Sequence, residues 1–188
     1  MTQHSNLLSP ENSLLLVVDI QTKLTSVMPE GAAEDMQENS NRLIEAANLL
    51  NIPVFTTEQY PQGLGATVDS LKAKFNTDTV YFEKTVFSCC AADNFNAALH
   101  KSTRKQIIIV GQETHVCILQ TALELLQQGY QVHILEDAVC SRKAEHKFYA
   151  LQRMQQQGAT ISNFESVLFE WLQNSKHAHF SAISQLLR

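Results

Sequence analysis

Short apolar runs alternate with segments of helical periodicity along most of this 188-residue chain, and that alternation is what most constrains its fold. The apolar runs lie at residues 13–20, 52–57, 79–84, 106–111, 130–137 and 159–164. Nearly continuous Val, Ile and Leu runs are typical of strands buried on both faces. Helical spacing appears between and after them, at residues 34–51, 93–101, 117–128, 144–157, 166–175 and 182–188. Strands that alternate with helices predict a parallel sheet covered on both faces, the three-layer α/β class.

Length and composition narrow the function classes. The chain is long enough for one domain with a full core, so we expect a single domain at 1–188 with a loose terminus at 1–12. A net charge of −5 with scattered Lys and Arg argues against nucleic acid as a partner. The longest apolar run, at 14–18, is too short to cross a membrane, and the first residues do not resemble a signal peptide.

The four cysteines are Cys89, Cys90, Cys117 and Cys140, and none forms a C-x-x-C pair. In a chain of this length, that usage predicts reduced thiols and a cytoplasmic location.

Polar residues end three of the predicted strands. Asp19 ends the first strand, Lys84 ends the third, and Cys117 follows the fourth at the start of a helix. Ligands of open α/β sheets bind beyond the carboxyl ends of the strands, so these three side chains are expected to share one site. Each residue also has a structural interpretation: Asp19 as a loop or helix-cap carboxylate, Lys84 as a surface lysine and Cys117 as a core residue. Only the occurrence of all three at strand ends favours a catalytic site.

The three residue types suit a nucleophilic mechanism. The N-terminus of a helix favours the thiolate form of a cysteine, which predicts a lowered pKa for the Cys117 thiol. A carboxylate takes the thiol proton and returns it to a leaving group, while an ammonium holds the anions in register. Backbone N–H groups at the helix start are suited to receive the oxyanion.

Three stretches that carry these residues, LLVVDIQ, FEKTVFS and VGQETHVCILQTALELLQQGYQVHILEDAVCSR, resemble the isochorismatase-like cysteine hydrolases. The chain is most similar to the branch of isochorismatase domain-containing proteins. The resemblance implies a catalytic triad of Asp19, Lys84 and Cys117 and a six-stranded parallel sheet of order 3-2-1-4-5-6. It also implies a cis peptide between Gln112 and Glu113, with the backbone N–H groups of Glu113 and Cys117 forming the oxyanion hole.

Departures from the family restrict the activity. Nicotinamidases of this family bind a metal through an Asp and several His after the second strand, but the stretch TTEQYPQGLGATVDSL contains no histidine. Isochorismatases proper generally lack the cysteine. We therefore expect no metal and no cofactor, and hydrolysis of an amide or an ester of a small molecule through a thioacyl-enzyme intermediate. The alternatives are a non-catalytic interaction protein of the same fold and a thiol redox enzyme.

Loops of this fold supply the walls of the pocket. We expect Gln21, Gln59, Tyr60 and His115 to contact the substrate. The last helices carry apolar residues that are predicted to be exposed and to form the interface of a homo-oligomer, at least a dimer: Phe169, Trp171, Leu172, Phe180 and Leu187.

Overall fold

A computed structural model describes residues 7–187 of the chain, and its strands form one parallel sheet. The strands are β1 (Ser13–Val18), β2 (Val54–Gln59), β3 (Val80–Lys84), β4 (Gln106–Gln112), β5 (Gln131–Cys140) and β6 (Thr160–Ser162). Their order in the sheet is β3-β2-β1-β4-β5-β6. The predicted class and strand order are therefore confirmed.

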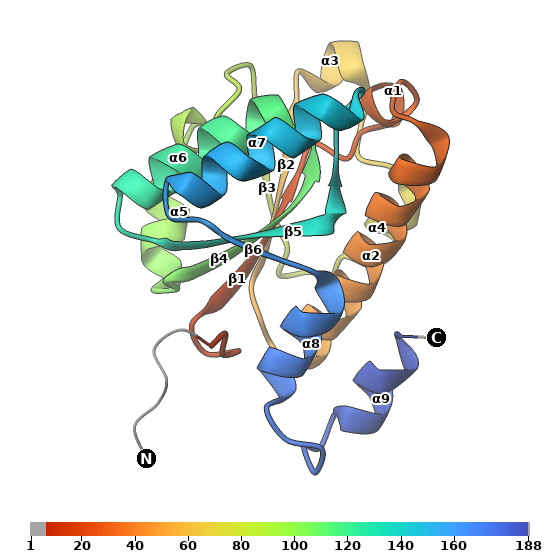
Figure 1. Ribbon diagram of the computed structural model, residues 1–188, viewed down its shortest axis with the longest axis vertical. Helices are drawn as coiled ribbons and strands as arrows, with labels where there is room; N and C mark the ends of the chain where they lie inside the picture. The colour runs from red at the N-terminus through yellow and green to blue at the C-terminus, as the bar shows by residue number, and fades with distance from the viewer. Residues whose placement is uncertain (1–6, 188) are drawn as a thin grey trace.

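Helices cover both faces of the sheet (Figure 1). They are α1 (Thr22–Thr25), α2 (Glu30–Leu49), α3 (Pro61–Leu64), α4 (Asp69–Lys72), α5 (Phe95–Ser102), α6 (Leu119–Gln127), α7 (Ala144–Gln156), α8 (Phe164–Leu172) and α9 (Phe180–Gln185), with a 3₁₀ turn η1 (Cys89–Ala91) and a π-helical turn η2 (Thr114–Ile118). One core cluster lies between the sheet and α2 with α8, and the other between the sheet and α5, α6 and α7. Among residues 7–187, no helix is both long and apolar enough to span a bilayer.

Strand β1 explains why its sequence is a continuous apolar run. Leu15 and Val17 belong to the core cluster of α2, whereas Leu14, Leu16 and Val18 belong to the cluster of α6. All five side chains are buried. Each contributes about 1.5–3 kcal/mol relative to an exposed position, so an alternating polar residue would be costly on either face.

The carboxyl ends of β1 and β4 approach each other closely at Gly111. This residue pairs with Val18 and has φ +114°, and a Cβ placed there would lie 2.1 Å from the Val18 carbonyl oxygen. Only glycine allows this approach, which brings together the two strand ends that precede Asp19 and Cys117.

Strand β5 is longer than the sequence predicts. Its ladder with β4 slips between Ile109 and Gly111 and continues to Cys140, because an irregularity inserts extra residues into β5. Asp137 therefore lies inside the strand, and the N-cap of α7 is Lys143. The Asp137 carboxylate accepts the Phe164 backbone N–H at 3.0 Å, at the start of α8.

Two predictions about the ends of the chain fail in part. Residues 7–12 are not loose: Leu8 is fully buried, and its N–H donates to Glu170 Oε2 at 2.8 Å, while residues 1–6 lie outside the described part. In the last helices, Trp171 and Leu172 are buried, and Trp171 Nε1 donates to Ser13 Oγ at 2.9 Å. Phe169 is exposed, as predicted, and Phe180 and Leu187 are partly buried, so the prediction of exposure is wrong only at Trp171 and Leu172.

Candidate active site

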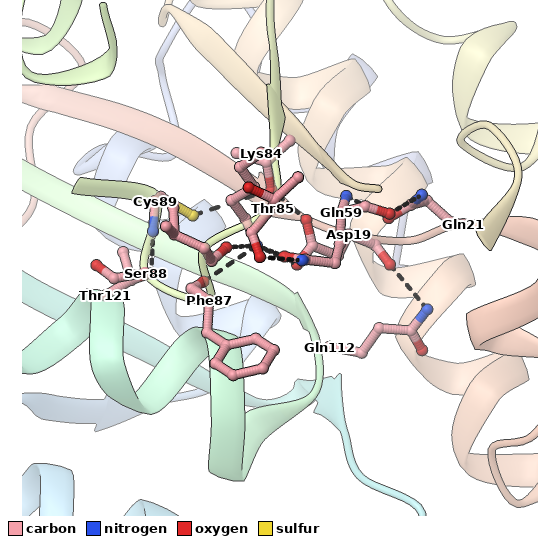
Figure 2. Close-up of polar contacts among 12 residues, drawn as sticks. Asp19, Gln21, Gln59, Lys84, Thr85, Phe87, Ser88, Cys89, Gln112 and Thr121 are labelled. Carbon is pink, nitrogen blue, oxygen red and sulfur yellow. Dashed lines mark hydrogen bonds and ion pairs between the residues drawn. The ribbon is translucent and has the colours of Figure 1, made fainter. Parts of the chain in front are cut away.

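The ends of β1, β3 and β4 bring Asp19, Lys84 and Cys117 together. Asp19 Oδ2 and Lys84 Nζ form an ion pair at 2.7 Å, and neither side chain has any exposed surface (Figure 2). Cys117 lies in η2 with 5% of its surface exposed, and the Asp19 carboxylate is near enough to its thiol to raise the pKa of that thiol. Asp19 therefore neighbours both the ammonium and the thiol.

A left-handed backbone turn delivers the Asp19 carboxylate to this position. In the alternation of β1, Asp19 follows Leu15 and Val17, whose side chains face α2. The φ of Asp19 is 51°, a conformation that aspartate tolerates better than most residues. The carboxylate lies instead with the side chains of the α6 layer, where Thr57 Oγ1 donates to Oδ1 at 2.7 Å.

Lys84 is held by more than its carboxylate. Its Nζ donates to Gln59 Oε1 at 2.7 Å and to the Phe87 carbonyl at 3.0 Å, with the Val86 carbonyl at 3.4 Å (Figure 2). Burial acts to lower the pKa of Lys84, but Asp19 offsets it and the pKa is raised. The pairing with Asp19 therefore favours the charged form of Lys84.

The predicted lowering of the Cys117 pKa is wrong. Burial raises the pKa of the thiol, and the neighbouring Asp19 carboxylate raises it further, against the opposite effect of Lys84. The helix-start argument fails because desolvation of a buried thiolate outweighs the small dipole effect, about 0.3–1 kcal/mol at a typical site. The resting site thus holds a neutral thiol beside a carboxylate.

The turn that carries Cys117 already uses two of its backbone N–H groups. The Val116 and Ile118 N–H groups both donate to the Glu113 carbonyl. Within residues 7–187, the N–H groups of Glu113 and Cys117 donate to no group outside their own turn. The Gln112–Glu113 peptide bond is cis. The Glu113 side chain points elsewhere, because its carboxylate accepts Arg142 Nε at 3.0 Å.

Gln21 and Gln59 occupy buried positions rather than an open wall. The Gln21 amide donates to the carbonyls of Gln59 and Gly65 and accepts the Gln59 N–H, at 2.6–2.9 Å. Gln59 in turn accepts from Lys84 and donates to the Thr85 carbonyl at 2.8 Å. Both glutamines are therefore engaged in hydrogen bonds within the protein, and Gln59 directly contacts Lys84.

Tyr60 and His115 lie closer to solvent. Tyr60 is 53% exposed and lines a cavity of about 370 Å³ together with Glu83, Lys84 and Asp93. His115 is partly buried, and its Nδ1 lies 3.0 Å from Ser141 Oγ. Burial lowers the pKa of His115, so its imidazole is neutral at pH 7.

The structure adds side-chain contacts of Thr57, Gln112 and Cys89 around the site that the sequence did not predict. Thr57 and Gln112 both bond Asp19, the first through its carboxylate and the second through its backbone carbonyl, at 3.0 Å. Cys89 Sγ lies 3.9 Å from Thr57 Oγ1, and burial raises the pKa of this second thiol to about 11. Polar residues at the ends of two apolar strands were the available signal for Thr57 and Gln112.

The described residues do not gather a metal-ligand set: no three His, Cys, Asp or Glu side chains in 7–187 are placed to hold one ion.

A parallel three-layer α/β fold and a buried polar site at the carboxyl edge of its central strands define the class of this protein. The chain belongs to the isochorismatase family, because the Isochorismatase domain model matches residues 13–166. Isochorismatase domain-containing protein 2 of Danio rerio is 37% identical, over 96% of this chain and 89% of that protein. The predicted family resemblance is confirmed.

Solved structures agree with the fold. A structure described as MAR1 ribonuclease from Caenorhabditis elegans is 38% identical with a TM-score of 0.91, covering 96% of this chain and 92% of the other. The YcaC product of Escherichia coli, described as an octameric hydrolase of unknown specificity, is 26% identical with a TM-score of 0.89, covering 99% and 91%. Family and neighbours support a hydrolase function.

Proposed function

We propose that this protein is a cysteine hydrolase that cleaves a C–N amide or an ester bond of a small molecule through a thioacyl-enzyme intermediate. One observation carries the proposal: a fully buried Asp19–Lys84 ion pair lies beside the buried Cys117 thiol, whose pKa is raised by burial and by the Asp19 carboxylate. A buried ion pair is a poor stabilising device, since an apolar replacement is often neutral or better. Its presence beside a thiol is what a nucleophilic site requires.

The raised pKa of Cys117 determines how the thiol is activated. Asp19 accepts the thiol proton as the sulfur attacks the substrate carbonyl, so the thiolate forms only during the step. The S–C bond forms, the C–N or C–O bond breaks, and Asp19 returns the proton to the departing nitrogen or oxygen. Water then attacks the thioester carbonyl while Asp19 takes one of its protons. The C–S bond breaks, and Asp19 returns the proton to the sulfur, so the thiol is regenerated as the acid product leaves.

Lys84 has an electrostatic and positioning role. Its raised pKa keeps the proton on nitrogen, so it does not exchange protons with the substrate. It fixes the Asp19 carboxylate between the ammonium and Thr57 Oγ1. The backbone N–H groups of Glu113 and Cys117 are the proposed donors to the oxyanion of the tetrahedral intermediate.

We further propose a homo-oligomer and a reducing, cytoplasmic setting, supported by an octameric structural neighbour and by four free cysteines. RNA cleavage, the activity named for the C. elegans neighbour, is less favoured. The net charge is −5, and the ammonium of Lys84 is already committed to protein oxygens.

The test combines a substrate screen with matched variants. Purified protein is screened for ammonia release from a panel of small amides, with ester and RNA arms and with EDTA added in parallel. Cys117→Ala should abolish turnover, and Asp19→Asn should slow acylation by about 10²–10⁴-fold because the amide keeps the shape but cannot take the proton. Lys84→Arg, which keeps the charge, should lose less than Lys84→Ala.

Two outcomes would remove the proposal. Turnover that persists in Cys117→Ala would exclude Cys117 as the nucleophile. Acylation at the wild-type rate in Asp19→Asn would exclude Asp19 as the base. Loss of activity with EDTA that zinc, iron or manganese restores would contradict the metal-independent mechanism.

A further inference from the structure

The left-handed backbone conformation of Asp19 must be stabilised by its neighbours, because it costs a residue other than glycine roughly 1 kcal/mol or more. Two backbone hydrogen bonds contribute to this stabilisation: the Asp19 N–H donates to the Thr57 carbonyl at 3.1 Å, and the Asp19 carbonyl accepts the Gln21 N–H at 2.8 Å. A third bond comes from a side chain on a different strand. Gln112 Nε2 donates to the same carbonyl of Asp19 at 3.0 Å (Figure 2).

Gln112 is an unusual residue for its place. It is fully buried at the carboxyl end of β4, where the preceding residues are apolar. Its Nε2 uses both hydrogens, one toward Asp19 and one toward Thr25 Oγ1 at 2.7 Å. Its Oε1 is buried with no partner among residues 7–187. A buried acceptor without a partner costs about 1–3 kcal/mol, so the amide is retained at a cost to stability.

The amide orientation is set by chemistry. The Asp19 carbonyl only accepts hydrogen bonds, so the NH₂ end of Gln112 must face it and Oε1 must face away. The backbone of Gln112 leads directly into Glu113 and the turn that carries Cys117. One residue therefore fixes the base by its side chain and begins the segment of the nucleophile.

We propose that Gln112 is a positioning residue of the hydrolytic site: by holding the Asp19 carbonyl from β4, it maintains the left-handed turn that aims the Asp19 carboxylate at the Cys117 sulfur. This inference rests on the proposed function, and it predicts a defect in chemistry rather than in substrate binding. A misplacement of about 1 Å costs on the order of 10²-fold in rate. Gln112→Met, which keeps length and removes the donor, should lower kcat by about 10–100-fold with little change in KM.

The first readout needs no substrate. The rate of Cys117 alkylation by iodoacetamide is followed against pH by peptide mass spectrometry, which separates it from Cys89. Asp19 raises the Cys117 pKa and Lys84 lowers it, while Cys89 adds a smaller raising effect. A carboxylate that is no longer aimed at the sulfur raises the pKa less, so Gln112→Met should shift the alkylation profile toward lower pH.

Thr25→Val is the matched control. It removes the acceptor of the other N–H of the same amide and leaves the bond to Asp19 intact. If Gln112 only joined α1 to β4, Thr25→Val and Gln112→Met would have equal effects. The positioning role predicts that only Gln112→Met moves the alkylation profile and kcat.

Asp19→Asn distinguishes a failure of the proposed function from a failure of the proposed role of Gln112. If Asp19→Asn leaves the Cys117 profile unmoved, the Asp–Cys pairing and the proposed function fail. If Asp19→Asn moves the profile and Gln112→Met does not, the function stands and the role of Gln112 is overturned. Gln112→Leu repeats the test should Gln112→Met not fold, and failure of both to fold would make Gln112 a structural residue and overturn the inference.

Discussion

Replacing Lys84 by methionine should be severely destabilising, because it breaks a buried ion pair from one side. Both side chains are 0% exposed and the N–O distance is 2.7 Å. Removing one partner of such a pair costs about 3–5 kcal/mol, since the other charge stays buried and uncompensated. Gln59 Oε1 and the Phe87 carbonyl also lose their donor, so the upper end of that range applies.

A double-mutant cycle gives this prediction its test. Asp19→Asn removes the carboxylate and leaves the Lys84 ammonium without the charge that raises its pKa. Asp19→Asn with Lys84→Met removes both charges, so the double variant should be more stable than the sum of the two single losses predicts, by about 2–3 kcal/mol.

The assay is urea unfolding at pH 7, followed by circular dichroism and by the fluorescence of the single tryptophan. A domain of this kind has about 5–15 kcal/mol of stability, so Lys84→Met should remain measurable at a lower urea midpoint. The prediction of a buried, interacting Asp19–Lys84 pair would be refuted in either of two cases. The losses in the free energy of unfolding could be additive in the cycle, or Lys84→Met could lose less than about 1 kcal/mol.

Three further outcomes are expected. Gly111→Ala should prevent stable folding or lower the urea midpoint sharply, because a Cβ there would lie 2.1 Å from the Val18 carbonyl oxygen; a wild-type midpoint would contradict the strand approach. Burial lowers the pKa of His133 to about 4, so stability should fall by about 2–3 kcal/mol between pH 6.5 and 4, where the unfolded chain binds a proton and the folded chain does not. His133→Gln should flatten that part of the pH–stability curve, and an unchanged slope would exclude His133 as its origin. Alkylation of Cys117 in the resting protein should be slower at pH 7 than that of a free thiol, since the pKa of the Cys117 thiol is raised; a rate above that of free cysteine would contradict the buried, neutral thiol.

The sequence predicted the parts of the site that depend on position along the chain. Apolar runs located the strands, and the residues that end them identified Asp19, Lys84 and Cys117. The end of a buried strand can be predicted from the sequence, because the apolar run stops where the chain leaves the core. The order of the strands came with the family resemblance and was confirmed.

Only the tertiary structure decided how these residues interact. The bond from Gln112 to Asp19 spans 93 residues, and that from Lys84 to Asp19 spans 65, so neither has a local signature. Strand alternation alone points Asp19 to the wrong layer, and its left-handed turn is sustained by neighbours from other strands. The pKa of the Cys117 thiol likewise depends on how completely the folded chain excludes water from the sulfur. Desolvation and long-range hydrogen bonds exist only after packing, whereas strand and helix periodicity is already present in the order of the residues.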